Sequence, residues 1–404
     1  MDPGVQTVYE ASDSPVQQPD PAVHPSASDP TVEPVGAMAV SESREPARSR
    51  VAADSVLLIG TRGGGGIHHY LDEQAERLSD RVDVSTYDMY SAPGDGALHA
   101  VETFLHSLLA GLLFPVRQSP DVDVVHVHTS HGFSFYRASF YVLYAARVWQ
   151  TPVLIHVHGS SFDAFIETDS RVVAAIQLFV FSHADRVIVL SAYWENALAD
   201  VVDEDLLTVV PNAVDPDLYE PVYDANPLHV VFVSNLIPRK GVPELCEAID
   251  RLVERADAPL EVTIGGKGPL ESDMRSLATR HENVEYKGYL SETRKRELLS
   301  RGSVFVLPSH AENMPIAILE AMAGGTAVLS TTVGAIPEVV TEDGGILVDP
   351  GDVDGLVRGF TYLLESPART AEMGRYNRRL VEEEYAWGGV VDRLLRIYHA
   401  EAEK

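Results

Sequence analysis

Cysteine is almost absent from this sequence: Cys246 is the only one in 404 residues. A single thiol excludes an internal disulfide framework and fits a reducing compartment. Long apolar runs are also missing. The first fifty residues have no apolar core of the kind that a signal peptide needs, and residues 104–116 are too short and too interrupted by His106 and Ser107 to span a bilayer. We therefore expect a cytoplasmic protein, either soluble or peripheral at the inner face of the cell membrane.

Basic residues are scarce as well. Lys and Arg total 31 against 60 Asp and Glu, which gives a formal net charge of −29. Such a surface repels the phosphates of nucleic acids and anionic lipid heads at long range, so we expect no nucleic-acid partner. Because molar salt screens the self-repulsion, the charge favours adaptation to a salty cytoplasm such as that of a haloarchaeon. An ordinary acidic cytosolic protein is the alternative.

Residues 1–53 are rich in Pro, Ser, Asp and Glu and nearly free of aromatics, which is typical of a disordered tail. Beyond them, short apolar runs alternate with helical patterns, as in a doubly wound parallel sheet. The turn-rich passage 211–216 separates two such series and predicts a linker. We therefore predict an α/β protein of two Rossmann-like domains, 54–215 and 216–384, facing across a ligand-binding cleft. The strands are expected near 55–60, 82–87, 122–127, 152–157, 186–190, 228–234, 260–265, 303–307 and 326–330.

The strongest chemical signal is a pair of carboxylates, Glu312 and Glu320, between a strand ending near Leu307 and a helix beginning around Pro315. Proline suits the first turn of a helix. Backbone N–H groups of residues 313–316, aided by the helix dipole, would then form an anion site. The alternative is an ordinary amphipathic helix with two solvated glutamates.

Glu312 and Glu320, with seven residues between them, resemble the Glu-x7-Glu motif of the family 4 glycosyltransferases, which have the GT-B fold. The resemblance extends in order over residues 55–400. It includes the glycines 63–66, His156-Val-His158-Gly159, Val210-Pro-Asn212, Ser234 to Gly241, Gly265 to Pro269, Val284 to Leu290, Thr332 to Glu338 and Gly345-Ile-Leu-Val348. It implies a last helix, in residues 385–404, that crosses back onto the first domain; a plain packing helix of the second domain is the alternative.

The resemblance implies a retaining transfer of a sugar from a nucleotide-sugar donor, most often a UDP sugar. The acceptor would be a cytoplasmic saccharide, free or lipid-linked, in surface-glycan or protein glycosylation. Arg239 and Lys240 would neutralise the diphosphate, Glu320 would accept from the ribose hydroxyls, and Glu312 and His158 would contact the donor sugar. Further donor contacts are implied for Gly66, Gly288, Leu290, Asn313, Met314, Pro315 and Ile316, and acceptor contacts for Gly63, Gly64, Gly65 and His68.

No metal or other cofactor is expected, because the basic pair and the helix terminus supply positive charge. His126 with His128 and His156 with His158 share strand faces, but we find no third ligand beside either pair. Two other functions remain open: a non-catalytic nucleotide-sugar-binding partner subunit and a nucleotide-sugar epimerase. The apolar run 104–114 indicates either peripheral membrane contact or a buried helix.

Overall fold

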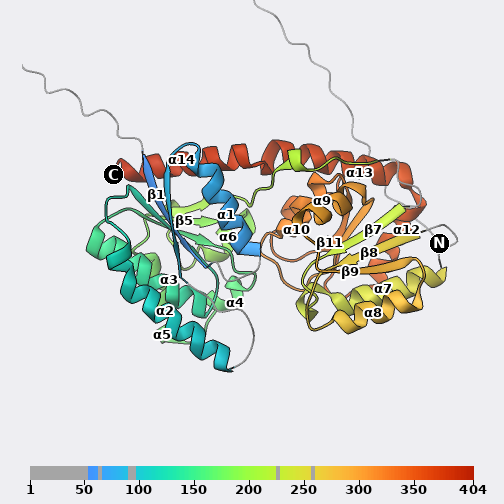
Figure 1. Ribbon diagram of the computed structural model, residues 1–404, viewed down its shortest axis with the longest axis horizontal. Helices are drawn as coiled ribbons and strands as arrows, with labels where there is room; N and C mark the ends of the chain where they lie inside the picture. The colour runs from blue at the N-terminus through green and yellow to red at the C-terminus, as the bar shows by residue number, and fades with distance from the viewer. Residues whose placement is uncertain (1–52, 62–65, 90–96, 224–227, 256–259) are drawn as a thin grey trace, which may run out of the picture. The chain divides into compact units, whose positions relative to one another are not determined.

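The computed structural model describes residues 53–61, 66–89, 97–223, 228–255 and 260–404 (Figure 1). The predicted N-terminal tail therefore lies outside the described residues, apart from Ala53. Within the described part of the chain, no helix is long and apolar enough to cross a membrane.

The first half of the chain forms a six-stranded sheet in the order β2-β1-β3-β4-β5-β6, and all of its pairings are parallel. Its central strands are mostly apolar because they are covered on both faces. They are β1 (Ser55–Gly60), β2 (Asp83–Asp88), β3 (Val124–Thr129), β4 (Val153–Val157), β5 (Arg186–Val189) and β6 (Leu207–Val209). The short edge strand β6 was not among the predicted strands.

The second half repeats this plan with another parallel sheet, in the order β12-β11-β10-β7-β8-β9. Its strands are β7 (Leu228–Val233), β8 (Leu260–Gly265), β9 (Val284–Gly288), β10 (Val304–Leu307), β11 (Ala327–Thr331) and β12 (Gly345–Val348). Two parallel sheets with flanking helices confirm the predicted α/β class.

The two faces of the first sheet are covered by different helices, because alternate residues of a strand point to opposite faces. In β1, Val56 and Leu58 join the cluster of α14 (Trp387–Ala402) and of α1 (Gly66–Ser79). Leu57 and Ile59 join the opposite cluster. That cluster holds Phe114 of α2 (Ala97–Arg117), Phe135 of α3 (Phe133–Tyr144) and Phe181 of α5 (Arg171–Phe181).

The last helix packs on the first sheet, although it follows the second one in sequence. The bridge between Val214 and Ala386 brings the chain back, and Trp387, Val390, Leu394 and Tyr398 of α14 are buried with residues of β1, β3, β4 and β5. Tyr398 Oη lies 2.7 Å from His126 Nδ1 of β3. Arg186 of β5 donates from Nε and Nη2 to Glu401 Oε1, at 3.0 and 2.7 Å.

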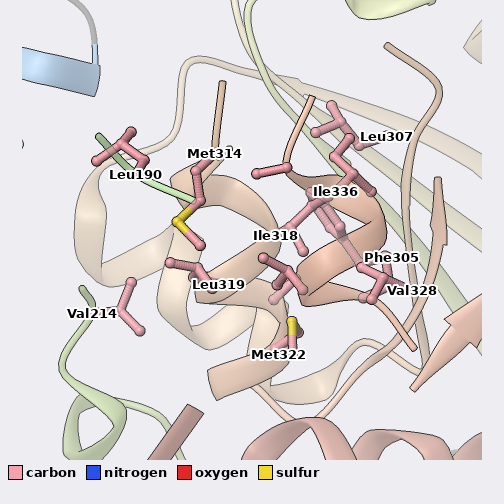
Figure 2. Close-up of a cluster of buried hydrophobic side chains, with 14 of the residues drawn as sticks. Leu190, Val214, Phe305, Leu307, Met314, Ile318, Leu319, Met322, Val328 and Ile336 are labelled. Carbon is pink, nitrogen blue, oxygen red and sulfur yellow. The ribbon is translucent and has the colours of Figure 1, made fainter. Parts of the chain in front are cut away.

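Helix α10 (Ile316–Ala323) is fixed by an apolar core on several sides (Figure 2). Ile318, Leu319 and Met322 are fully buried. The cluster that holds them also includes residues of β10, of β11, of α11 (Ile336–Val339) and of the chain before residue 216: Phe305, Leu307, Val328, Ile336, Leu190 and Val214. Side chains so enclosed keep one orientation. The start of α10 is therefore a rigid platform.

Candidate active site

A close approach of two backbone segments builds the centre of the site. The short 3-10 helix Pro238–Lys240 follows β7 and ends at Gly241, whose φ of 69° lies in the left-handed region that favours glycine. A Cβ at Gly241 would meet the carbonyl of Pro308, in the loop after β10. His310 N also donates to Arg239 O, at 2.8 Å. These contacts hold the basic pair against the loop that carries Glu312.

Glu312 is the point where the basic pair and the loop meet. Its side chain is only 6% exposed, and its Oε1 accepts hydrogen bonds from Lys240 Nζ at 2.5 Å and from Ser309 Oγ at 2.7 Å. Its Oε2 lies 3.7 Å from Arg239 Nη1, which also donates to Ala311 O at 2.6 Å. Residues predicted to act on different parts of the donor thus form one charged cluster.

The start of α10 adds backbone donors beside this cluster. Pro315 is the N-cap residue and has no N–H, so the predicted row of donors from 313 to 316 has a gap at Pro315. The N–H groups of Asn313, Met314 and Ile316 have no acceptor within the described chain. Together with the partial positive charge at a helix N-terminus, they form a place for an anion.

Two asparagines hold this turn in place. Asn212 Nδ2 donates to Met314 O at 2.7 Å. Asn313 Nδ2 lies 3.4 Å from Val157 O and 3.3 Å from Gly159 O, at the end of β4. The side chain of Asn313 is therefore engaged in joining the start of α10 to the segment that carries His158. For Asn313, the backbone N–H and the buried Oδ1, which has no hydrogen-bond partner among the described residues, are the groups left to meet a ligand.

The second carboxylate, Glu320, is paired with a residue that sequence reasoning missed. Lys295 of α9 (Glu292–Arg301) donates to Glu320 Oε1 at 2.6 Å, and its Nζ lies 2.8 Å from Glu292 Oε2. Burial raises the pKa of Glu320, although Lys295 opposes this shift. Burial alone would lower the pKa of Lys295, but Glu320 and Glu292 together raise it. The basic run 294–296, unusual in a chain so poor in lysine, was the available signal.

The four histidines of β3 and the end of β4 form one buried ladder. His128 lies opposite His156 in the register of the two strands. His126 Nε2 shares a hydrogen bond with His156 Nδ1 at 3.2 Å, and His128 Nδ1 shares one with His158 Nε2 at 2.8 Å. Burial lowers the pKa values of His126 and His158 to about 3 and those of His128 and His156 well below their usual range. All four rings are therefore neutral near pH 7.

The ladder corrects the premise that neither histidine pair has a third ligand nearby. Adjacent pairing of β3 and β4 brings ligand atoms of His126, His128 and His156 within 4.8 Å of one another. The ring of His126 is inclined by only 21° to that of His128 and by 14° to that of His156. Mutual hydrogen bonding is the geometry observed, and metal-free transfer stays a prediction.

The remaining predicted site residues lie in three places. Gly63, Gly64 and Gly65 are outside the described residues, and for Gly66 and His68 only their position in the first turn of α1 is described. Gly288, with a φ of 66°, accepts from Gly266 N at 2.8 Å. The side chain of Leu290 packs so closely on Gly265 that a Cβ there would meet it. The loops after β8 and β9 therefore meet where nucleotide contacts were predicted.

Comparison with known proteins agrees with this geometry. Residues 53–213 match a family model described as glycosyl transferase 4-like domain, and residues 220–380 match one described as glycosyl transferases group 1. The two models cover both sheets and the predicted motifs. The chain belongs to the family 4-like glycosyltransferases.

Individual relatives support the assignment. Over 382 residues the glycosyltransferase is 31% identical to an alpha-maltose-1-phosphate synthase of Mycolicibacterium smegmatis, covering 83% of this chain and 95% of that protein. Over 260 residues it is 30% identical to an MMP alpha-(1->4)-mannosyltransferase of Mycolicibacterium hassiacum, covering 63% of this chain and 60% of that protein. A solved sucrose-phosphate synthase from Thermosynechococcus elongatus superposes with a TM-score of 0.71 at 19% identity, over 86% of this chain and 98% of that one. That likeness confirms the GT-B fold.

Proposed function

We propose that this glycosyltransferase retains the anomeric configuration and needs no metal. In this proposal it moves a hexose from a nucleoside-diphosphate sugar to a saccharide or lipid-linked acceptor in surface-glycan or protein glycosylation. The observation that carries the proposal is the cluster of Arg239, Lys240 and Glu312 beside the N–H groups that begin α10.

The charge of this cluster suits a diphosphate leaving group. Two cations and one carboxylate leave a net charge of +1, and the backbone donors of Asn313, Met314 and Ile316 add to it. Negative charge grows on the diphosphate as the glycosidic bond breaks, and fixed donors stabilise that growth without rearranging. This is the charge that a divalent cation would otherwise bring, which supports metal-independent transfer.

Glu312 is better suited to orienting the sugar than to attacking it. Its Oε1 accepts hydrogen bonds from Lys240 and Ser309, and its Oε2 lies 3.7 Å from Arg239, so the nearby positive charge lowers the nucleophilicity of the carboxylate. We therefore assign no covalent nucleophile. In the front-face route that we propose, the departing phosphate helps to take the proton of the acceptor hydroxyl. His158, being neutral, contributes a hydrogen bond to donor hydroxyls and no charge.

The nucleotide is expected to lie between Glu320 and the loops after β8 and β9. Lys295 favours the charged form of Glu320, and a carboxylate accepts ribose hydroxyls well. UDP is the first carrier to test and GDP the next. Because one relative is a mannosyltransferase, mannose belongs among the donor sugars to be tested.

A donor-consumption assay tests the proposal. Nucleoside diphosphate release is measured from a panel of UDP and GDP sugars with saccharide and lipid-linked acceptors, with and without EDTA. Glu312→Ala should lower kcat by about 10²–10³, and Glu365→Ala at the exposed end of α12 (Val353–Glu365) should not. NMR of the product gives the anomeric outcome. Undiminished turnover by Glu312→Ala, inversion, or loss of activity with EDTA would each refute the corresponding part of the proposal.

A further inference from the structure

Helix α2 buries polar side chains and exposes apolar ones, which is the reverse of the pattern expected for a surface helix of a water-soluble protein. It buries the small polar residues Thr103 and Ser107, which are 8% and 9% exposed. A row of large apolar side chains, spaced as one helical face, is instead more than half exposed to solvent: Val101, Phe104, Leu105, Leu108, Leu109, Leu112 and Val116. The expectation that run 104–114 is simply a buried helix is therefore wrong for most of its side chains.

Two neighbouring helices extend this exposed apolar surface. Helix α5 buries Gln177 completely, with its Nε2 donating to Phe165 O at 2.7 Å, while Val172 and Phe179 are exposed. Helix α3 exposes Phe133, Tyr136 and Phe140. The helices α2 and α3 are in contact, as are α3 and α5, and all three cover the same face of the first sheet (Figure 1). We call the exposed side chains of α2, α3 and α5 the three-helix surface.

The charge of the three-helix surface is opposite to that of the whole chain. Residues 97–117, 133–144 and 171–181, which form α2, α3 and α5, contain three arginines and one glutamate, a net charge of +2 in a chain of −29. Of these arginines, Arg117 and Arg171 are exposed. A protein that is so acidic elsewhere has excluded carboxylates from these helices almost entirely.

We infer that the three-helix surface docks this glycosyltransferase on a lipid bilayer that contains anionic lipids. Helices that lie in a membrane interface carry bulky apolar side chains toward the acyl chains and basic residues toward the headgroups, as these do. A contiguous apolar surface of this kind is uncommon on monomeric soluble proteins. A second copy of the chain is a poorer occupant, because pairing this surface with itself would bring like-charged arginines together.

The net charge alone suggests that an anionic membrane repels the protein, but the three-helix surface favours contact with such a membrane. The acidic remainder of the protein repels an anionic membrane at distances beyond the Debye length, about 10 Å at 0.1 M salt. Once the three-helix surface touches the bilayer, apolar burial is unaffected by screening and the local arginines are attracted. In molar salt, the long-range repulsion is removed and the apolar contribution remains.

Vesicle flotation of the full chain tests this inference without donor or acceptor, so its outcome is independent of the proposed reaction. Vesicles of phosphatidylcholine alone and of phosphatidylcholine mixed with phosphatidylglycerol are compared in dilute and in molar potassium chloride. We expect the wild type to float with mixed vesicles in molar salt.

Leu108→Ser combined with Leu112→Ser should weaken binding about tenfold or more, because it removes two apolar contacts. Tyr362→Ser, at an equally exposed position on α12, is the matched control and should bind like the wild type.

A separate variant tests the attraction of the exposed arginines to anionic lipid headgroups. Arg117→Gln combined with Arg171→Gln should weaken binding to mixed vesicles in dilute salt and leave binding to phosphatidylcholine unchanged. Circular dichroism checks that each variant is folded. A wild type that stays at the bottom of the gradient, or a Leu108→Ser, Leu112→Ser protein that floats equally well, would overturn the inference. Concentration-dependent dimers that these serines dissociate, without vesicle binding, would identify a protein interface instead and would also overturn it.

Discussion

Lys240 Nζ lies 2.5 Å from Glu312 Oε1, and this contact joins the segments that follow two neighbouring strands, β7 and β10. The carboxyl ends of adjacent parallel strands meet at one sheet edge, where ligands of such folds bind. With side chains that are only 12% and 6% exposed, the two residues form a pair largely shielded from water. Loss of either partner alone would therefore leave the other charge shielded from water without its counter-ion.

Neutralising only one partner of this pair should destabilise the protein. Lys240→Met leaves the Glu312 carboxylate shielded without its closest cation, and we expect a loss of about 2–3 kcal/mol in the free energy of unfolding. Lys240→Met with Glu312→Gln should recover most of this loss, because no unpaired charge remains. Urea denaturation in molar potassium chloride measures both. Equal stability of the wild type and Lys240→Met would show that the pair is not coupled.

Gly241→Ala should separate the same two segments. At a φ of 69° an alanine is strained, and its Cβ would meet the carbonyl of Pro308. We expect a destabilisation of about 1–3 kcal/mol together with weaker donor binding, because Lys240 moves away from Glu312. Gly388→Ala, where a Cβ meets nothing within 4 Å, is the control. Unchanged donor affinity in Gly241→Ala would mean that the close approach does not position the cations.

Lys295→Met should make nucleotide binding sensitive to pH. Burial already raises the pKa of Glu320, and without Lys295 that pKa rises further, so the carboxyl takes up a proton at a higher pH than in the wild type. A protonated carboxyl is a weaker acceptor for ribose hydroxyls. As the pH is lowered, the calorimetric Kd should therefore begin to increase at a higher pH in the variant than in the wild type. A flat profile in both proteins would argue against a ribose contact of Glu320.

The histidine ladder should make the folded state sensitive to acid. Because folding lowers the pKa values of His126, His128, His156 and His158, their contribution to stability is present above about pH 6.5 and is lost as the pH falls toward 3. Each histidine adds a slope of about 1.4 kcal/mol per pH unit within that window.

The pH dependence of urea denaturation between pH 6 and pH 4 measures this slope. His156→Gln should lower it by about 1.4 kcal/mol per pH unit, whereas His106→Gln on the exposed side of α2 should leave it unchanged. A slope that His156→Gln leaves intact would show that the ladder already takes up protons in the folded state.

Most of the fold could be predicted because its signals are local. Runs such as Ser55–Gly60 are apolar on both faces, and the described strands begin and end within about two residues of the predicted ones. The strands β6, β9 and β12 were not among the predicted ranges. The edge strand β6 has only three residues, and β12 begins at Gly345 directly after Gly344, so neither of these two carries a clear pattern.

The positions of the candidate site residues along the strands and helices could be predicted, but the contacts between them could not. Spacing placed Glu312 before α10 and Lys240 after β7, yet their ion pair depends on the order of strands in the sheet. Lys295 meets Glu320 through packing of α9 on α10, for which the sequence offered only a short basic run. The histidine pairs looked separate because strand register, which places His128 opposite His156, cannot be read from either strand alone. The solvent exposure of the apolar side chains of α2 could not be predicted either, because an apolar run has the same sequence pattern whether it faces the core or a membrane.

Calorimetric titration of UDP, GDP and ADP sugars into the wild type and into Lys240→Ala, in molar potassium chloride, tests the central claim most directly. The account predicts that one nucleotide sugar binds selectively, without added metal, and that Lys240→Ala weakens this binding at least tenfold, as expected for loss of a charge-assisted contact of about 1.4 kcal/mol or more. Binding that Lys240→Ala leaves unchanged, or no binding of any of these sugars to folded wild-type protein, would contradict it.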